Sequence, residues 1–464
     1  MPTSAVAGSG SHLPAVVTRH VQRTPAPHAA AEPTRTRVIP LWERGFIIML
    51  FVCFSGALTP LFWRANLSSD PTEANPLTQL IFFSIYIGAI VLMLRQWRLA
   101  LTVVLHSWLL WLLVLLAVSS VAWTTDPSLT VRRSLALVGT TVVGLYLATR
   151  LDVREQVRYL MLALLGTAVL SIVAGIVFPS DAILGGLWRG VFVHKNVLGR
   201  AMMLSCVVAG MVAFSQYRWR MVAWASIVIS FAGILLSGSR TALVVLIVIL
   251  ITAPFFRMLR WNISISVPLL LMTLAGGSYI MVWLGTYSDS ILGALGKDSS
   301  LTGRTELWSK VLEMIQRHPW YGYGYAGFWQ GWEGPSAEVW DFVQWTPAHS
   351  HFGLMDLTLD LGLVGLTIFL VGYGISFWRA ISFTAQSGGS EHFWPLIYLI
   401  FMLLYNLTES AILARNSIFW LLYVSVFLSL ARWRAGTRQR RRRQTLLNRL
   451  PPHQRSRAVA RLLQ

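Results

Sequence analysis

Two histidines are candidates for moving a proton. His349 and His351 directly precede a long apolar run that begins at Phe352. A histidine near neutral pH can take the proton of an attacking hydroxyl, so either ring is a candidate general base. The alternative is a histidine that only satisfies hydrogen bonds at the membrane interface. A spacing of two does not put both rings on one helical face, and no HExxH pattern or cysteine partner accompanies them, so the sequence predicts no metal centre.

A single arginine occupies the polar stretch 236–241, between two apolar runs. The planar guanidinium of Arg240 is suited to grip a phosphate through two parallel hydrogen bonds. The alternative is an interfacial arginine whose stem lies along apolar surface while its head stays in water. We favour the phosphate-binding interpretation.

Further cationic and polar residues gather where another apolar run begins. They are Arg189, His194, Lys195 and Asn196. Backbone N–H groups and the helix dipole favour anions at a helix N-terminus, so this group is a second candidate for binding phosphate. An ordinary polar start to a membrane span is the alternative. Arg304 is a further candidate, and its alternative is a structural pairing with Glu306 or Glu313.

Carboxylates also occur inside or beside apolar runs. Asp356 and Asp360 lie one helical turn apart, and Glu409 lies close to Asn406 and Arg415. Charged groups in a membrane span are costly and usually face the interior of the bundle, so we expect these side chains to face inward.

The elements that carry these residues are predicted from composition. Of 464 residues, 55% are hydrophobic and only 12% are charged, with a mean hydropathy of +0.59. Apolar runs of 18 or more residues recur without alternation, which predicts transmembrane helices rather than a barrel. The chain is therefore predicted to be an all-α integral membrane protein with about twelve transmembrane helices, at residues 45–64, 77–95, 101–122, 134–149, 158–178, 196–215, 220–237, 240–256, 264–285, 352–377, 394–411 and 416–431.

Lysine and arginine between the spans predict the orientation. They concentrate in alternate connections, which the positive-inside rule places in the cytoplasm. Nine helices (45–285) then lead to a polar outer loop (286–351), and three more helices (352–431) follow. Both tails are cytoplasmic: residues 1–44, which we expect to be disordered, and residues 432–464, which hold eleven arginines and no acidic residue. All candidate site residues converge on the outer face.

The net charge of +19 raises nucleic-acid binding as one function class. The positive charge lies at span ends and in the tails, which favours contact with anionic lipid instead, so we predict membrane lipids and no nucleic acid as partners. No P-loop, DxD pair or G-x-S-x-G motif occurs. A nucleotide-fuelled or serine-hydrolase mechanism therefore has no support.

The outer loop is predicted to contain one helix, from about residue 302 to 318. Its apolar face is expected at Leu307, Val311, Leu312 and Ile315. A glycine-rich turn with aromatic walls follows at 321–325, and then four tryptophans, Trp329, Trp332, Trp340 and Trp345. These rings either lie at the membrane interface and pack there, or stack on sugar faces.

In their order and spacing, these motifs resemble the O-antigen ligase/polymerase family of bacterial envelope glycosyltransferases. The resemblance covers roughly residues 45–430, and its specific parts are residues 190–199, 237–241, 303–324 and 349–365. It implies a GT-C-like bundle that works without a metal or other cofactor and inverts the anomeric carbon. The implied donor is a glycan on a polyprenyl diphosphate.

The resemblance also implies roles for individual residues. Arg240 resembles the arginine that binds the donor diphosphate, with Arg189 and Lys195 as its neighbours. His351 resembles the base that activates the acceptor hydroxyl, with His349 beside it. The family often has a polar residue after this histidine, whereas this chain has Phe352. The departure leaves open which of the two histidines is the base.

Within the family, the stretch at 192–199 is most similar to exopolysaccharide polymerases of the succinoglycan type. This favours polymerisation of lipid-linked repeat units at the outer face of the bacterial inner membrane. One alternative is a ligase that transfers the glycan to a lipid A core, and another is a transporter of lipid-linked sugars. A flippase and a chain-length regulator are the implied protein partners.

Overall fold

The computed structural model describes residues 39–58, 60, 76–259, 262–293, 303–386, 389–449, 451 and 454. Residues 1–38 of the predicted tail (1–44) and the start of the predicted loop helix at Thr302 lie outside these residues. The first half contains the helices α1 (Leu41–Ser55), α3 (Pro76–Leu94), α4 (Trp97–Leu105), α5 (Trp108–Ser119), η1 (Ser120–Ala122), α6 (Pro127–Arg150), α7 (Val153–Val177), α8 (Pro179–Ala182), α9 (Lys195–Ser215), η2 (Tyr217–Trp219) and α10 (Arg220–Ser237). The second half contains α11 (Arg240–Met258), α12 (Ile263–Gly293), α13 (Gly303–Arg317), η3 (Gly331–Glu333), α14 (Ser336–Val343), α15 (Gly353–Gln386), η4 (Ser390–Phe393), α16 (Trp394–Tyr405) and α17 (Ile418–Arg449). The predicted all-α fold is confirmed, with one short antiparallel hairpin of β1 (Ile183–Leu184) and β2 (Leu187–Trp188).

The helices of this chain are long and apolar enough to span a membrane. Among the described residues, nine helices meet this condition, or ten if α4 and α5–η1, which are bent by 86° at their junction, form one span. The integral-membrane prediction is confirmed. Each of the twelve predicted spans contains a helix, but the count of twelve is not confirmed, because α1 has 15 residues and α16 only 12.

Three helices form the centre of the bundle. About 78% of the apolar window of α9 is buried by protein, and 72% of that of α17 and 61% of that of α6. The corresponding share is only 17% for α3, so α3 lies at the periphery with its apolar side chains facing outward. The short α16 is almost entirely buried and packs against α11, α12, α15 and α17, which explains why its apolar residues need no lipid contact.

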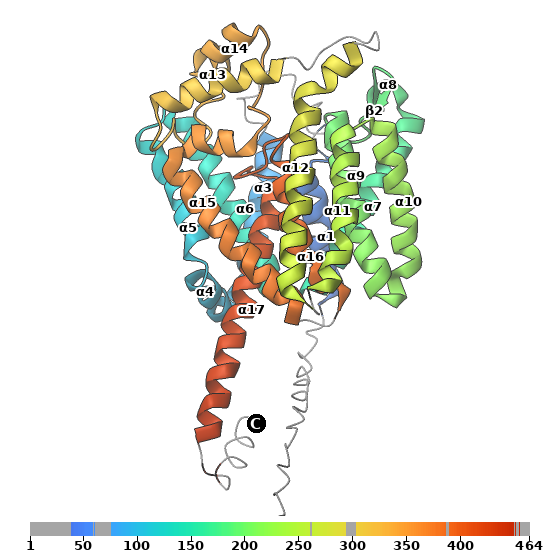
Figure 1. Cartoon of the computed structure of the whole chain (residues 1–464), viewed down its shortest axis with the longest axis vertical. Helices are drawn as coiled ribbons and strands as arrows, with labels where there is room; N and C mark the ends of the chain where they lie inside the picture. Colours follow the sequence, from blue (N-terminus) through green and yellow to red (C-terminus); the bar gives the residue numbers. More distant parts are fainter. Residues whose placement is uncertain are drawn as a thin grey trace, which may run out of the picture.

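One end of the bundle carries a separate layer. In Figure 1, α13, α14, α8 and β2 lie at one end, and the C-terminal part of α17 projects from the opposite end. The α13–α14 layer has its own small core, in which Leu307, Val311 and Met314 are buried. The predicted apolar face was wrong at Leu312, whose side chain is 47% exposed, because positions i, i+4 and i+7 share a face and i+5 does not.

A break in α15 fastens this layer to the membrane bundle. Gly362 has φ +63°, and a Cβ there would lie 2.2 Å from the carbonyl carbon of Trp320. On either side of the break, the Leu363 N–H donates to the Pro319 oxygen (2.7 Å) and the Tyr323 N–H donates to the Leu359 oxygen (2.8 Å). The backbone groups freed by the broken helix are thus paired with the segment that follows α13.

Candidate active site

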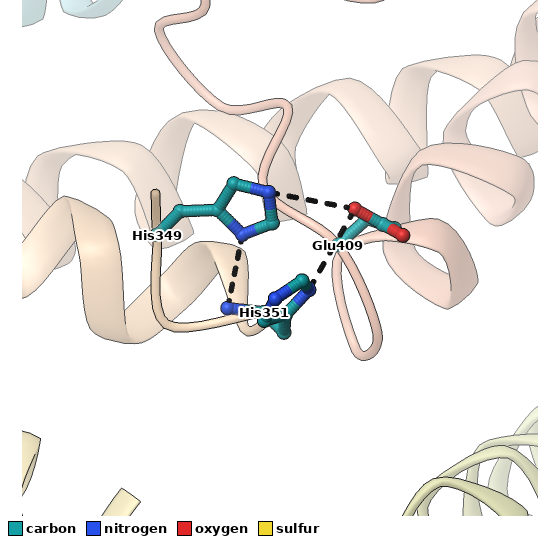
Figure 2. Close-up of side chains that lie close together, drawn as sticks. All are labelled: His349, His351 and Glu409. Atoms are coloured by element: carbon teal, nitrogen blue, oxygen red, sulfur yellow. Dashed lines mark hydrogen bonds and ion pairs between the residues drawn. The ribbon is translucent and has the colours of Figure 1, made fainter. Parts of the chain in front are cut away.

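The two histidines lie on a turn directly before α15. His351 has φ +58°, a left-handed conformation that is uncommon for a residue other than glycine. This conformation points its backbone N–H at His349 Nδ1 (3.1 Å) and brings the two ring centroids within 4.1 Å. Figure 2 shows the two rings side by side. The expectation that a spacing of two keeps them apart is wrong, because it assumed a helix.

The turn is held in place by the first turn of α15. The Asp356 carboxylate accepts hydrogen bonds from the Ser350 N–H (3.0 Å), from Trp329 Nε1 (2.9 Å) and from the Ser410 hydroxyl. Asp356 thus ties three loop segments together at the start of α15.

A third ionisable group faces both histidines. Glu409, in the segment after α16, has its Oε2 atom 3.7 Å from His349 Nε2 and 3.9 Å from His351 Nδ1 (Figure 2). Asn406 fixes this segment, because its carbonyl accepts from the Gly353 N–H (2.8 Å) and its side-chain oxygen accepts from the Ala411 N–H (2.8 Å). The sequence marked Glu409 only as a costly charge and gave it no role in the site.

Burial keeps the ring of His351 neutral. The pKa of His351 is lowered to about 3, first by burial and then by the neighbouring His349 and by Arg304. A neutral imidazole has a free lone pair on one ring nitrogen, so His351 can accept a hydrogen bond from a hydroxyl at neutral pH. Arg304, one of the predicted site residues, lies at the start of α13. Its positive charge contributes to lowering the pKa of His351.

A narrow cavity adjoins Glu409, and neither histidine lines it. Its lining residues come from α9, the α10–α11 turn, α11 and α16: Asn196, Arg200, Met203, Ser239, Thr241, Ala242, Val245, Tyr405 and Glu409. Arg200 donates to the Tyr405 hydroxyl, and its guanidinium lies over the ring of Phe419, 5.2 Å from the ring centroid. A cation and a carboxylate thus line the same cavity at the start of α9.

Arg200 was missed in the sequence. It lies four residues after Asn196, so both side chains share one face of α9, and its charge inside a predicted span marked it as unusual. These two features together would have identified it.

The cluster predicted at residues 189–196 is only partly free to bind a ligand. His194 is the N-cap of α9, where its Nδ1 atom accepts from the Asn196 N–H (3.2 Å). The pKa of His194 is lowered overall. Burial is the largest cause and Lys195 adds to it, while the charge of Glu409 acts in the opposite direction. Arg189 instead donates to the backbone oxygens of Asp181 (2.5 Å) and Val193 (3.2 Å), so it holds the connection between the hairpin and α9.

Arg240 begins α11, and its side chain is exposed. Its neighbours Ser239 and Thr241 line the cavity, whereas Arg240 is not among the lining residues. The turn that carries it packs tightly on α9, because a Cβ at Gly199 would lie 2.4 Å from the Ser239 Cβ atom. The backbone of Arg240 therefore lies between two residues that line the cavity, while its side chain is exposed.

The histidine–glutamate cluster also has the composition of a metal site. One ligand atom from each of His349, His351 and Glu409 lies within 4.8 Å of the others. Two histidines and one carboxylate form a ligand set that suits divalent transition metals. The prediction of a metal-free site therefore stays a prediction and needs an experiment.

Comparison with known proteins bears on this arrangement. Residues 225–370 match the family described as O-Antigen ligase. This part of the chain, about a third of its length, is thus similar to that family. The matched region contains Arg240, Arg304, His349 and His351, whereas Arg200 and Glu409 lie outside it.

One relative is similar to about half of this chain. The chain is 26% identical over 260 residues to "Exopolysaccharide production protein ExoQ" of Rhizobium meliloti (strain 1021). The alignment covers 54% of this chain and 59% of that relative. The alignment thus spans less than two thirds of that relative's length, and the match is a similarity that does not transfer the relative's activity to this chain.

Proposed function

We propose that this protein is a membrane glycosyltransferase that polymerises polyprenyl-diphosphate-linked oligosaccharide repeat units in exopolysaccharide or O-antigen biosynthesis. The observation that carries the proposal is the neutral, half-buried His351 beside Glu409, next to a cavity lined by Arg200. This is a base with an acidic partner close to a cationic pocket. The name of the relative, an exopolysaccharide production protein, favours polymerisation.

The geometry favours His351 over His349 as the base. His349 Nδ1 accepts the His351 N–H, so the ring proton of His349 lies on Nε2, toward Glu409. His349 can accept a further proton only by losing the bond that shapes the turn. His351 is free of that constraint. With its proton on Nδ1, toward Glu409, its Nε2 atom keeps a lone pair for an incoming hydroxyl.

The reaction then needs few parts. His351 takes the proton of the acceptor hydroxyl as the oxygen attacks the anomeric carbon of the donor sugar. Glu409 stabilises the imidazolium that forms. The diphosphate leaves with its negative charge, which Arg240, Lys195, Arg304 and Arg200 are suited to stabilise without a metal. Direct displacement inverts the configuration of the anomeric carbon.

The proposed setting is the bacterial inner membrane, with both termini in the cytoplasm and the α13–α14 layer in the periplasm. The arginine-rich end of α17 lies at the end of the bundle opposite that layer, as the positive-inside rule requires (Figure 1). A flippase that delivers the lipid-linked repeat and a chain-length regulator are the proposed partners.

Transfer by the purified protein tests the proposal. Full-length protein in lipid nanodiscs is incubated with a polyprenyl-diphosphate-linked repeat unit, and the products are resolved by size. We expect a ladder of lipid-linked oligomers from the wild type and none from His351→Ala. Unchanged transfer by His351→Ala would refute the site assignment.

A ligase is the second candidate, because the matched family description names an O-Antigen ligase. Deleting the gene separates the two functions. Loss of long chains with single repeat units remaining indicates a polymerase. Long lipid-linked chains that never reach the lipid A core indicate a ligase.

A further inference from the structure

A second, larger cavity lies in the outer layer, away from the histidine turn. Its volume is about 650 Å³, within the range of pockets that hold small molecules. Its lining residues are Trp123, Thr125, Arg317, His318, Pro319, Trp320, Tyr321, Gly322, Tyr323 and Pro335. We call it the aromatic groove. None of its lining residues has a part in the chemistry proposed above.

The groove presents aromatic rings to solvent. Trp320 is 64% exposed, Tyr321 56% and Trp123 37%. Trp123 and Tyr321 meet edge to face with their ring centroids 5.8 Å apart, and Trp123 Nε1 donates to the Tyr321 oxygen (3.2 Å). Rings of a membrane-interface belt lie on the outside of a bundle, whereas these two contact each other and both line the groove.

The rim of the groove is polar but nearly neutral. Arg317 donates to Glu338 (2.6 and 2.7 Å) and to Glu313 (2.6 Å), so its charge is already paired. His318 and Thr125 complete the polar side. Exposed ring faces beside a few hydrogen-bonding groups suit an uncharged ligand that is apolar on one face and rich in hydroxyls at its edges. A pyranose ring has this chemistry.

Backbone hydrogen bonds to α15 hold the segment that carries Trp320 and Tyr321. Residues 319–323 are paired with α15 on both sides of its break, through Leu363 with Pro319 and Tyr323 with Leu359. Since a Cβ at Gly322 would lie 2.3 Å from the Leu359 oxygen, the two segments touch backbone to backbone. A preorganised groove loses little conformational entropy on binding a ligand.

The first part of α15 links the groove to the histidine turn. Gly353 lies two residues after His351. The segment that lines the groove is hydrogen-bonded to α15 on both sides of the break at Gly362. Nine residues of helix separate them by about 14 Å, at about 1.5 Å per residue. A ligand that occupies both places must be an extended chain rather than a single sugar.

We propose that the aromatic groove binds sugar residues of the glycan chain several units away from the reacting end. Trp320 and Tyr321 stack on the sugar faces, while His318 and Thr125 bond to the hydroxyls. This inference rests on the proposed function, because it takes the glycan to be the substrate. The groove holds the chain in register while its end reacts at His351.

Binding is measured apart from transfer. Purified full-length protein in nanodiscs is titrated with a soluble oligosaccharide of one to three repeat units, cut from the polysaccharide of the same strain, and followed by calorimetry. We expect Trp320→Ala to weaken binding by about five- to tenfold, as truncation of an aromatic anchor does. Trp320→Phe, which keeps a ring, should restore most of the affinity.

Trp332→Ala is the matched control, because Trp332 is also 64% exposed but lies outside the groove. We expect it to bind like the wild type. Equal affinities of Trp320→Ala and the wild type would overturn the inference, and so would quenching of Trp320 fluorescence by brominated lipid that the saccharide does not relieve. The second result would identify the groove as a lipid contact.

Transfer assays separate this inference from the proposed function. With the lipid-linked donor, we expect Trp320→Ala to make shorter chains and to raise the KM for the acceptor more than it lowers kcat. Saccharide binding that depends on Trp320 in a protein that transfers nothing would support the groove and refute the glycosyltransferase. Transfer with a wild-type chain length by Trp320→Ala would refute the groove alone.

Discussion

Replacing Glu409 with glutamine removes the charge that faces both histidines and keeps the shape of the side chain. The Glu409 Oε2 atom lies 3.9 Å from His351 Nδ1, and the two side chains are only 15% and 24% exposed. Two opposite charges at this distance attract by about 4 kcal/mol at an effective dielectric constant of about 20. Since some solvent reaches the site, we take about 3 kcal/mol as the stabilisation of the imidazolium that forms during transfer.

A loss of about 3 kcal/mol from the transition state lowers the rate about a hundredfold. We therefore expect Glu409→Gln to reduce kcat by about 10²-fold with little change in the KM for the donor. The rate is measured in a single turnover with excess purified protein, so that product release does not mask the chemical step. Glu333→Gln, which changes an exposed acid on η3, is the matched control and should behave like the wild type.

Stability must be followed beside activity. We expect the thermal unfolding midpoint of Glu409→Gln to stay close to that of the wild type, because no hydrogen bond of the Glu409 carboxylate in the described residues is lost. A rate within threefold of the wild type, with an unchanged midpoint, would refute the role of Glu409 as partner of the base. It would leave His351 to act alone.

Four further outcomes follow from the site. Arg240→Ala should abolish transfer in the donor assay, and Arg240→Lys should keep only part of it, because an ammonium cannot form the two parallel bonds of a guanidinium. Asp356→Ala should cost about 2–3 kcal/mol through the unpaired Ser350 N–H and Trp329 Nε1, seen as a thermal midpoint several degrees lower in detergent. Because the folded pKa of His351 is about 3 and the unfolded value is near 6.5, the unfolding free energy should fall as pH drops below about 6.5, and less so in His351→Phe. Treatment with a chelator should leave transfer unchanged, whereas a loss that zinc restores would show that the histidine–glutamate cluster holds a required metal.

The sequence predicts the helical segments well because hydropathy records where apolar residues lie. It does not record where a helix stops. α16 ends at Tyr405. Beyond it, the side-chain amide of Asn406 accepts a hydrogen bond from the Ala411 N–H and donates one to the Met402 oxygen (2.7 Å), in place of further helical hydrogen bonds. The run at 101–122 is interrupted by a bend of 86° that no glycine or proline marks. For these reasons the predicted spans contain helices while their number was not confirmed.

The candidate site residues that the sequence predicted are those that stand in a recognisable local motif. His349 and His351 stood out because they directly precede a span, and Arg304 because it opens the loop helix. The left-handed backbone of His351 was not predictable, because only the contacts around the turn select it. Glu409 lies 58 residues beyond His351, and its place opposite both rings depends on how α16 packs beside α15.

The helical piece of α15 before its break sets the distance between the histidine turn and the aromatic groove. The helical piece from Gly353 to Leu361 has the histidine turn at one end and the aromatic groove at the other. In the proposed mechanism, its length therefore sets which sugar of a bound chain reaches His351. Inserting one residue into this piece would move one end by about 1.5 Å and turn it by about 100°. Under the proposal, the length of this helix is thus matched to the spacing of the sugars along the bound chain.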